Sequence, residues 1–164
     1  MKKLNQLIEK LNLQKLKEKK FLTFKVMDKN FENEIVSDLY LPMTVLSNVK
    51  LNKIEFKNLD LELSSFYNCS FKNCQFVEST IKDADFHKIM FTNCNFLKNS
   101  FVETWFRSCK FINTSIEKSD EDDLMVTIIV DSTFGKSDKS ITFNGEFFLA
   151  DILLPANKID DLLS

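Results

Sequence analysis

The chain has 164 residues and a formal net charge of −2, with 17 Phe but only two Gly and two Pro. This length suits one domain with a substantial core, and the near-neutral charge favours neither nucleic acid nor a membrane surface as a general partner. No run approaches the roughly 18 apolar residues of a membrane span, and no apolar stretch follows the first lysines as in a signal peptide. We therefore expect a cytoplasmic protein whose four Cys are reduced thiols.

An amphipathic helix is predicted over residues 3–18. Residues 1–20 carry a net charge of +5, and the predicted apolar face holds Leu4, Leu7, Ile8 and Leu11. The lysine-rich polar face could bind anionic lipid, but the apolar face has no aromatic residue, and capping the following structure would use the same leucines. Short strands are predicted over residues 21–27 and 35–41, so we expect residues 1–38 to form an N-terminal cap.

A period of five dominates the middle of the chain. Starting at Leu41, sixteen successive positions, each five further along the chain, are large and apolar; we call these positions the central register. They are Leu41, Leu46, Leu51, Phe56, Leu61, Phe66, Phe71, Phe76, Ile81, Phe86, Phe91, Phe96, Phe101, Phe106, Phe111 and Ile116. The positions two places earlier, the small register, are small or apolar nearly throughout and include all four Cys. A period of five fits neither a helix nor a plain strand, and it indicates a short extended segment and a corner, repeated.

Both registers are clearest between Phe66 and Phe76, where the sequence is FYNCSFKNCQF. This pattern resembles the pentapeptide-repeat family, which implies an all-β fold: a right-handed, four-sided β-solenoid with four repeats in each coil. Sixteen repeats then predict about four coils over residues 39–120. The central register extends back to Phe21, but Lys29 and Glu34 interrupt the small register, so residues 1–38 are predicted to be a cap and not extra coils. The ends of such a stack expose unpaired backbone groups and need caps.

The pattern of five stops after Ser119. Residues 124–130 and 141–149 have the composition of strands, and Asn144-Gly145 within the second is a strong signal for a tight hairpin turn. Residues 121–164, with a net charge of −6, are therefore predicted to form a β-rich C-terminal cap or an interaction segment.

One outward face is the leading candidate for binding a partner. With four repeats of five in each coil, residue i lies below residue i + 20, and this places the only Trp, the only His and the only Arg on one side. The candidate residues are Tyr67, Asp85, His87, Trp105 and Arg107. Trp, Tyr and Arg are the residues that most often anchor protein interfaces. The alternative binding element is the acidic run Asp120, Glu121, Asp122 and Asp123.

Other residue groups favour structural roles. His87 near Asp85 lacks an accompanying nucleophile, so no acid–base catalysis is expected. Cys74 and Cys94 should be buried thiols in adjacent coils. A ladder of side-chain amides is predicted at one corner, formed by Asn73, Asn93 and Asn113. The cysteine spacing does not match a zinc site, and the acidic run lacks the ligand spacing and Gly of a calcium loop. We expect no metal, no cofactor and no enzymatic activity.

Three functions remain open from the sequence. The first is a protein-binding module that neutralises one partner, such as an immunity protein that inhibits a toxin domain, with the acidic C-terminal segment able to cover a basic nuclease. The second follows from the resemblance, because some pentapeptide-repeat proteins mimic DNA and protect or inhibit DNA gyrase. That role needs acidic faces, whereas residues 39–120 have a net charge of +1. The third is a structural or assembly scaffold. No direct binding of nucleic acid is expected, and the oligomeric state is open.

Overall fold

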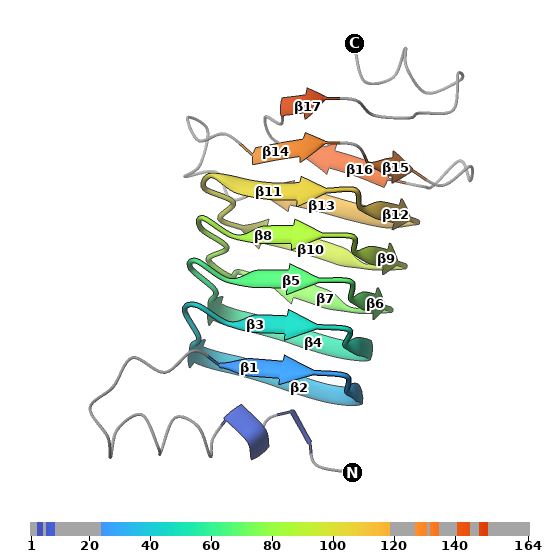
Figure 1. Cartoon of the computed structure of the whole chain (residues 1–164). Helices are drawn as coiled ribbons and strands as arrows, with labels where there is room; N and C mark the ends of the chain where they lie inside the picture. The colour runs from blue at the N-terminus through green and yellow to red at the C-terminus, as the bar shows by residue number, and fades with distance from the viewer. Residues whose placement is uncertain are drawn as a thin grey trace.

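The computed structural model describes residues 3–4, 6–8, 24–118, 127–130, 132–134, 141–144 and 148–150. Almost all of these residues belong to short strands that wind into a stack of coils (Figure 1). The strands are β1 (Lys25–Met27), β2 (Asn30–Tyr40), β3 (Val45–Ser47), β4 (Lys50–Asp60), β5 (Ser65–Tyr67), β6 (Ser70–Lys72), β7 (Gln75–Val77), β8 (Asp85–His87), β9 (Met90–Thr92), β10 (Asn95–Asn99), β11 (Thr104–Arg107), β12 (Lys110–Ile112), β13 (Thr114–Lys118), β14 (Thr127–Val130), β15 (Thr133–Phe134), β16 (Ile141–Asn144) and β17 (Phe148–Ala150).

Each coil has four sides, and each side pairs in parallel with the same side of the neighbouring coils. The first face contains β1, β3, β5, β8, β11, β14 and β17. The second face contains the first halves of β2 and β4, then β6, β9, β12 and β15, and the third face contains their second halves, then β7, β10, β13 and β16. The fourth face is joined by the pairing of Tyr40 with Asp60, by bridges from Asp60 to Thr80 and from Thr80 to Ser100, and by backbone hydrogen bonds between the coils. The chain is thus a four-sided β-solenoid, as the period of five predicts.

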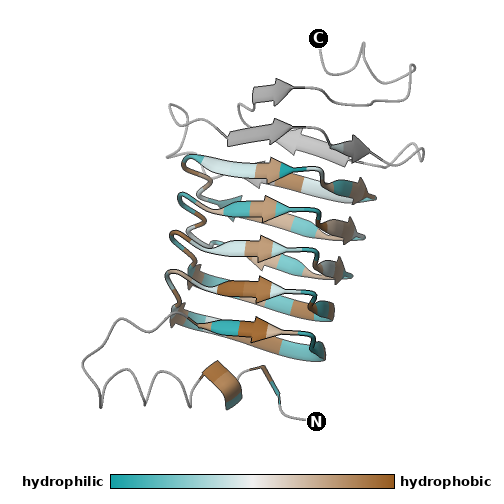
Figure 2. Ribbon diagram, viewed as in Figure 1, coloured by the Kyte–Doolittle hydropathy of each residue, from teal (hydrophilic) through white to brown (hydrophobic). Residues whose placement is uncertain are grey.

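The central register fills the interior. Every one of its residues from Leu41 to Ile116 is buried, and apolar segments recur at the same place in successive coils (Figure 2). The Phe rings stack along the axis: the ring centroids of Phe66 and Phe86 are 4.5 Å apart, and those of Phe86 and Phe106 are 4.8 Å apart. These distances match the spacing of paired strands, so each ring packs on its counterpart in the next coil.

The small register links neighbouring coils through its polar atoms. The side chains of Cys74, Cys94 and Asn99 each donate a hydrogen bond to the carbonyl of the central residue 23 positions earlier, one coil below. In the opposite direction, the backbone N–H of Thr44 donates to Ser64 Oγ in the next coil at 3.1 Å. Cys, Ser, Thr and Asn therefore suit this register because they are small and carry a donor that satisfies a buried carbonyl.

The corners explain why the chain needs so little glycine. Eighteen residues at intervals of five, from Asp28 to Asn113, have φ between 49° and 58°, and none of them is Gly. Ten of the eighteen are Asn or Asp, the residues that enter the left-handed region most readily, and none is β-branched. The corners thus favour Asn and Asp, a preference that is not apparent from the period of five alone.

Amide ladders connect these corners, as predicted for Asn73, Asn93 and Asn113. The side-chain amide of Asn113 donates to Asn93 Oδ1 at 2.9 Å, and that of Asn93 donates to Asn73 Oδ1 at 3.1 Å. A second ladder runs along the preceding corner, where the amide of Asn68 donates to Asn48 and the amide of Asn48 donates to Asp28. Each ladder bonds one coil to the next outside the backbone.

The solenoid begins earlier than predicted. β1 pairs with β3 and β2 pairs with β4 in the same offset as the later coils, so residues 25–40 extend the stack by one coil. The prediction that residues 21–38 lie outside the coils was wrong for this part of the chain. Lys29 is exposed, whereas Glu34 is only 9% exposed and its Oε1 accepts a hydrogen bond from the Leu4 backbone at 3.1 Å. Polar residues are therefore tolerated in the small register of the first coil.

The N-terminal segment covers this first coil. Leu4 and residues 6–8 are helical, and the Leu7 N–H donates to the Lys3 carbonyl at 3.2 Å. Leu4 and Ile8 are each 2% exposed and belong to the same apolar core as Phe24 and Val36. This agrees with the expected capping use of the leucine face, and the rest of the predicted helix over residues 3–18 lies outside the described residues.

At the other end, the strands after the repeats continue the same faces. β14, β15 and β16 pair in parallel with β11, β12 and β13. The sequence offset between stacked positions grows, however: Trp105 pairs with Ile128, and Ile116 pairs with Phe143. The predicted hairpin at Asn144 is wrong, because β16 belongs to the third face and β17 pairs in parallel with β14 on the first.

Candidate protein-binding face

All five candidate residues lie on the first face, on three consecutive strands. Tyr67 ends β5, Asp85 and His87 flank the centre of β8, and Trp105 and Arg107 belong to β11. The strand register pairs Tyr67 with His87 and His87 with Arg107, and it pairs Asp85 with Trp105. The outward positions on either side of the buried Phe column thus form two vertical rows, as the four-repeat coil predicts.

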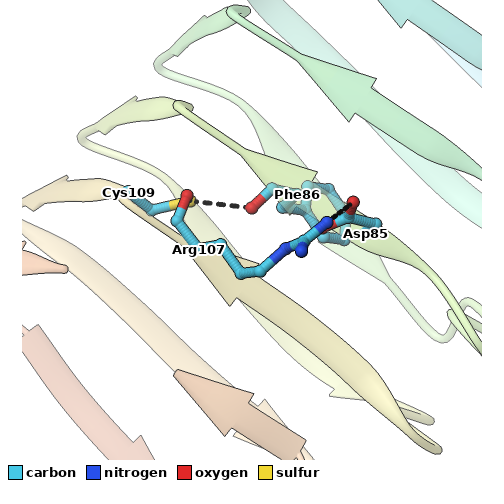
Figure 3. A network of polar contacts seen from close by, with 4 residues as sticks. All are labelled: Asp85, Phe86, Arg107 and Cys109. Atoms are coloured by element: carbon cyan, nitrogen blue, oxygen red, sulfur yellow. Dashed lines mark hydrogen bonds and ion pairs between the residues drawn. The ribbon is translucent and has the colours of Figure 1, made fainter. Parts of the chain in front are cut away.

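Arg107 crosses diagonally between these rows. Its Nε donates to Asp85 Oδ1 at 3.0 Å, and a second guanidinium nitrogen contacts Asp85 Oδ2 (Figure 3). The carboxylate raises the pKa of the Arg107 guanidinium above its ordinary value. The side chains of Arg107 and Asp85 remain 48% and 32% exposed, so this two-pronged pair orients the guanidinium while leaving it accessible to a partner.

Tyr67 and His87 contact each other edge to face. Their ring centroids are 5.2 Å apart with an interplanar angle of 78°, and Lys88 Nζ lies 5.9 Å from the centre of the Tyr67 ring. Lys88, at the adjoining corner, was not among the predicted residues. Its position directly after His87 in the five-residue period could have predicted that it lies beside this face. The ring and ammonium positions favour a cation–π contact.

Trp105 provides the largest apolar group of the face. It is 43% exposed, as is Tyr67, and by register its row continues to Ile128 in β14. Large aromatic rings beside an oriented Arg are the composition of a protein-interface anchor, because aromatic side chains offer a large contact area. We refer to Tyr67, Asp85, His87, Trp105 and Arg107 below as the anchor face.

The interior thiols Cys109 and Cys94 are held in the protonated form. Cys109 Sγ donates to the Phe86 carbonyl at 3.2 Å (Figure 3), and burial raises the pKa of the Cys109 thiol to about 12. A hydrogen bond with Cys74, together with burial, also raises the pKa of Cys94. All four cysteines are free and buried, as predicted. Thiols held in this protonated state are poor nucleophiles.

The anchor face contains neither the hollow nor a metal site in the part of the chain that the structure describes. A hollow of about 230 Å³ lies where the second face meets the third, lined by Asn33, Glu34, Ile35, Lys53, Ile54, Glu55, Asn73 and Gln75. None of the anchor-face residues lines it. Among the described residues, no group of three or more His, Cys, Asp or Glu is placed to hold a metal ion. The acidic run Asp120–Asp123 is outside the described residues.

The comparison with protein families agrees with this architecture. Residues 60–97 match the model for pentapeptide repeats in eight copies, and these residues form successive sides of the coils described above. Over these residues the chain is therefore similar to the pentapeptide-repeat family, the resemblance that the period of five indicated. The pentapeptide-repeat fold is generally a non-catalytic scaffold that binds proteins. No curated protein matches this chain.

Several solved pentapeptide-repeat structures are similar to the chain at low levels. A trypsin-treated variant of QnrB1, a plasmid-mediated fluoroquinolone resistance protein, is 13% identical, with 85% of this chain and 86% of that one covered and a TM-score of 0.29. Rfr23 from the cyanobacterium Cyanothece 51142 is 13% identical, with 91% and 97% covered and a TM-score of 0.31. HetL from Nostoc sp. strain PCC 7120 is 14% identical, with 79% and 60% covered and a TM-score of 0.22. These values are too low to transfer any function.

The described residues contain no helix that is long and apolar enough to cross a membrane.

Proposed function

We propose that this pentapeptide-repeat protein uses the anchor face to bind and neutralise one partner protein, as an immunity-type inhibitor of a toxin domain. The observation that carries the proposal is the arrangement of Trp105, Tyr67 and Arg107. Three side chains of the types that dominate interface energies share one flat face, and Asp85 already orients the guanidinium. A partner that docks there meets a guanidinium whose position is already set by Asp85, which lowers the entropic cost of association.

The shape of the face supports a protein partner over a small molecule. The anchor residues lie on parallel strands of one sheet and do not line the hollow of about 230 Å³, whereas small-molecule sites are concave and bury most of their ligand. A tightly held inhibitor also needs a rigid surface, and the stacked Phe column behind this face supplies one. We place the protein in the cytoplasm, because its four cysteines are free thiols and reducing compartments keep them so.

The test is capture from native cells, with wild-type protein and two variants as bait. Trp105→Ala/Arg107→Glu removes an exposed ring and reverses a charge on the anchor face. Leu97→Ala/Lys98→Glu makes the same kind of change on the third face, where Leu97 is 38% exposed, and serves as the matched control. The expected result is one stoichiometric partner that is retained by the control and lost with the anchor-face variant.

A second step decides the immunity function. The purified partner should show a toxic or nuclease activity that an equimolar amount of the wild-type protein abolishes and that the anchor-face variant leaves intact. A partner kept by the anchor-face variant would move the binding site elsewhere, including the run Asp120–Asp123. Capture of DNA gyrase subunits instead of a toxin domain would replace inhibition of a toxin by modulation of gyrase.

A further inference from the structure

The second and fourth faces of the solenoid carry opposite charge. We count each corner residue with the face that precedes it. Among the described residues of the second face, the charged ones are five Lys against one Glu, namely Lys29, Lys50, Lys53, Lys72, Lys110 and Glu32. On the fourth face, counted over the part of the chain that the structure describes, they are four carboxylates against one Lys, namely Asp60, Glu62, Asp83, Glu103 and Lys82. The near-neutral repeat region is thus divided into a basic side and an acidic side.

The other two faces mix the two signs. The first face carries Lys25, Lys88 and Arg107 against Asp28 and Asp85, and two of these, Arg107 and Asp85, neutralise each other directly. On the third face, lysines and carboxylates are interspersed along the same strands and corners, as at Glu55 and Lys57. The strongest separation of charge is therefore between two sides of the square, and chain order places these two sides opposite each other.

The charges on both sides are accessible. All five lysines of the second face are exposed, and Glu103 on the fourth face is exposed while Asp60, Glu62 and Asp83 are half-buried. Among the described residues of the fourth face, the one ion pair is between Lys82 Nζ and Glu62 at 3.8 Å, with both side chains partly exposed. Exposed pairs of this kind contribute little within one molecule, so the carboxylates stay available to cations from outside.

We propose that these two faces bind each other in neighbouring copies, so that the protein associates side by side into open rows. Opposite sides of a square meet by a sideways shift without rotation. Such a shift brings the second face of one copy against the fourth face of the next, with Lys50 and Lys53 level with Asp60 and Glu62, since all four belong to the coil of residues 45–64. A contact between two different surfaces is heterologous, and without rotation it leaves one free face at each end of the row.

A second copy is the occupant that the charges favour. Each molecule carries both halves of a complementary contact at the same height and with the same strand spacing, and its formal net charge of −2 gives little overall repulsion between copies. Exposed apolar side chains accompany the charges on both sides, with Leu63 54% and Met90 42% exposed. The contact uses none of the anchor-face residues, so rows of this kind leave the proposed partner site open.

The test is a charge swap followed by sedimentation velocity. One variant, Lys50→Glu/Lys53→Glu/Lys72→Glu, gives the second face an excess of carboxylates. The other, Glu62→Lys/Glu103→Lys, gives the fourth face an excess of lysines. The corner positions tolerate these changes, because other left-handed corners of the same solenoid already hold Lys and Glu.

Matched controls make the same changes in net charge on the first and third faces. Lys25→Glu/Lys57→Glu/Lys98→Glu corresponds to the first variant, and Glu55→Lys/Glu78→Lys corresponds to the second. Circular dichroism and thermal melts verify that each variant is folded.

At about 10 mM salt, where the Debye length is ~30 Å, wild type and both controls should form species heavier than the 19.2 kDa monomer as concentration rises. At ~1 M salt, with a Debye length of ~3 Å, they should be monomers. Each swapped variant alone should stay monomeric at low salt, because its second and fourth faces now have the same sign. An equimolar mixture of the two swapped variants should associate again, since contacts between unlike variants pair faces of opposite sign.

Monomeric wild type at low salt over the whole concentration range would overturn the proposal. Failure of the mixed variants to associate would overturn it as well, since the contact would then not depend on these two faces. Controls that lose association to the same degree would point to net charge and not to the faces. Loss of association in a Trp105→Ala/Arg107→Glu variant would transfer the self-contact to the anchor face.

Discussion

The thiol of Cys109 donates a hydrogen bond to the backbone carbonyl of Phe86, one coil below. The same relationship recurs for Cys69 with Leu46 and for Thr104 with Ile81. Each pair joins a small-register donor to a central-register carbonyl. Cys and Thr therefore suit the small register by supplying a hydrogen-bond donor as well as by having a small volume, because an unbonded buried carbonyl would cost free energy.

Replacing Cys109 with Ser should make the protein less sensitive to alkaline pH. Burial raises the pKa of Cys109 to about 12 from an ordinary value of 9.0, so the folded state holds this proton more tightly than the unfolded state. The stabilisation is complete below pH 9 and is lost as the pH rises from 9 towards 12. The difference in unfolding free energy between wild type and Cys109→Ser should therefore change by about 1 kcal/mol between pH 7.5 and pH 10. Wild type is the protein that loses stability.

Urea unfolding of both proteins at the two pH values measures this difference. Cys109→Ala provides the control, since it removes both the titration and the donor and should be less stable than Cys109→Ser at either pH. Parallel pH profiles for wild type and Cys109→Ser would show that Cys109 does not hold its proton as described.

A charge placed at Phe91 should unfold the protein. Phe91 is fully buried, and its ring centroid is 5.3 Å from that of Phe71 and 5.2 Å from that of Phe111. Phe91→Asp would bury an unpaired carboxylate in the middle of the stack, at a cost comparable to the whole stability of a domain of this size. Thr92→Asp, at the next position and on the outward side, should remain folded. Thermal melts followed by circular dichroism compare the two, and a cooperative wild-type-like melt for Phe91→Asp would contradict the assigned register.

The amide ladder at Asn93 should contribute separately from its corner conformation. Asn93 has φ of 52° and bonds to both Asn73 and Asn113. Asn93→Gly keeps the left-handed conformation accessible and removes the ladder bonds, whereas Asn93→Ala removes the bonds and adds about 1–2 kcal/mol of backbone strain. The unfolding free energy should therefore fall in the order wild type, Gly, Ala. Equal stabilities of the Gly variant and wild type would mean that the ladder adds nothing.

The contact between Glu34 and Leu4 should stabilise the first coil. Glu34→Ala leaves the Leu4 N–H without its carboxylate acceptor and should cost about 1–3 kcal/mol, whereas Glu34→Gln keeps an acceptor and should cost less. Amide hydrogen exchange of β1 and β2 locates the effect, because only the first coil should lose protection. Uniform loss over all coils would place the role of Glu34 outside the cap.

The pair of Asp85 and Arg107 should affect the folded protein only slightly. A double-mutant cycle with Asp85→Ala and Arg107→Ala should give a coupling energy of no more than about 1 kcal/mol, falling with salt, because both side chains are partly exposed. Chemical denaturation at low and high salt measures it. A salt-independent coupling well above this value would mean that the pair is a structural element of the coil and not an orienting contact for binding.

The period of five was sufficient to predict the solenoid and the rows of the anchor face, because both follow from a constant sequence offset between stacked positions. The ends departed from that rule for physical reasons. Glu34 interrupts the small register, yet no coil lies below the first one among the described residues, and a backbone N–H of the cap satisfies the carboxylate. Beyond β13 the offset is larger, as in the pairing of Lys110 with Thr133 and of Ile116 with Phe143. The later strands therefore stay in the stack while the sequence period disappears.

The contact between Arg107 and Asp85 could not be inferred from stacking. The register pairs Arg107 with His87. The long guanidinium side chain instead reaches the carboxylate in the neighbouring row, because that is the opposite charge within its length.

The opposite charges of the second and fourth faces were also not visible in the sequence. Counted along the sequence, lysines and carboxylates are mixed, and only the assignment of each residue to a side separates them.

The constant offset between β3, β5, β8 and β11 has a consequence for how such a chain can change over generations. A tandem duplication of any stretch of codons that encodes one whole coil would insert a complete turn and leave every residue above and below it in register. A duplication slightly shorter or longer would rotate every later side chain away from its place. The height of the molecule is therefore free to vary in whole steps, while its cross-section is held fixed.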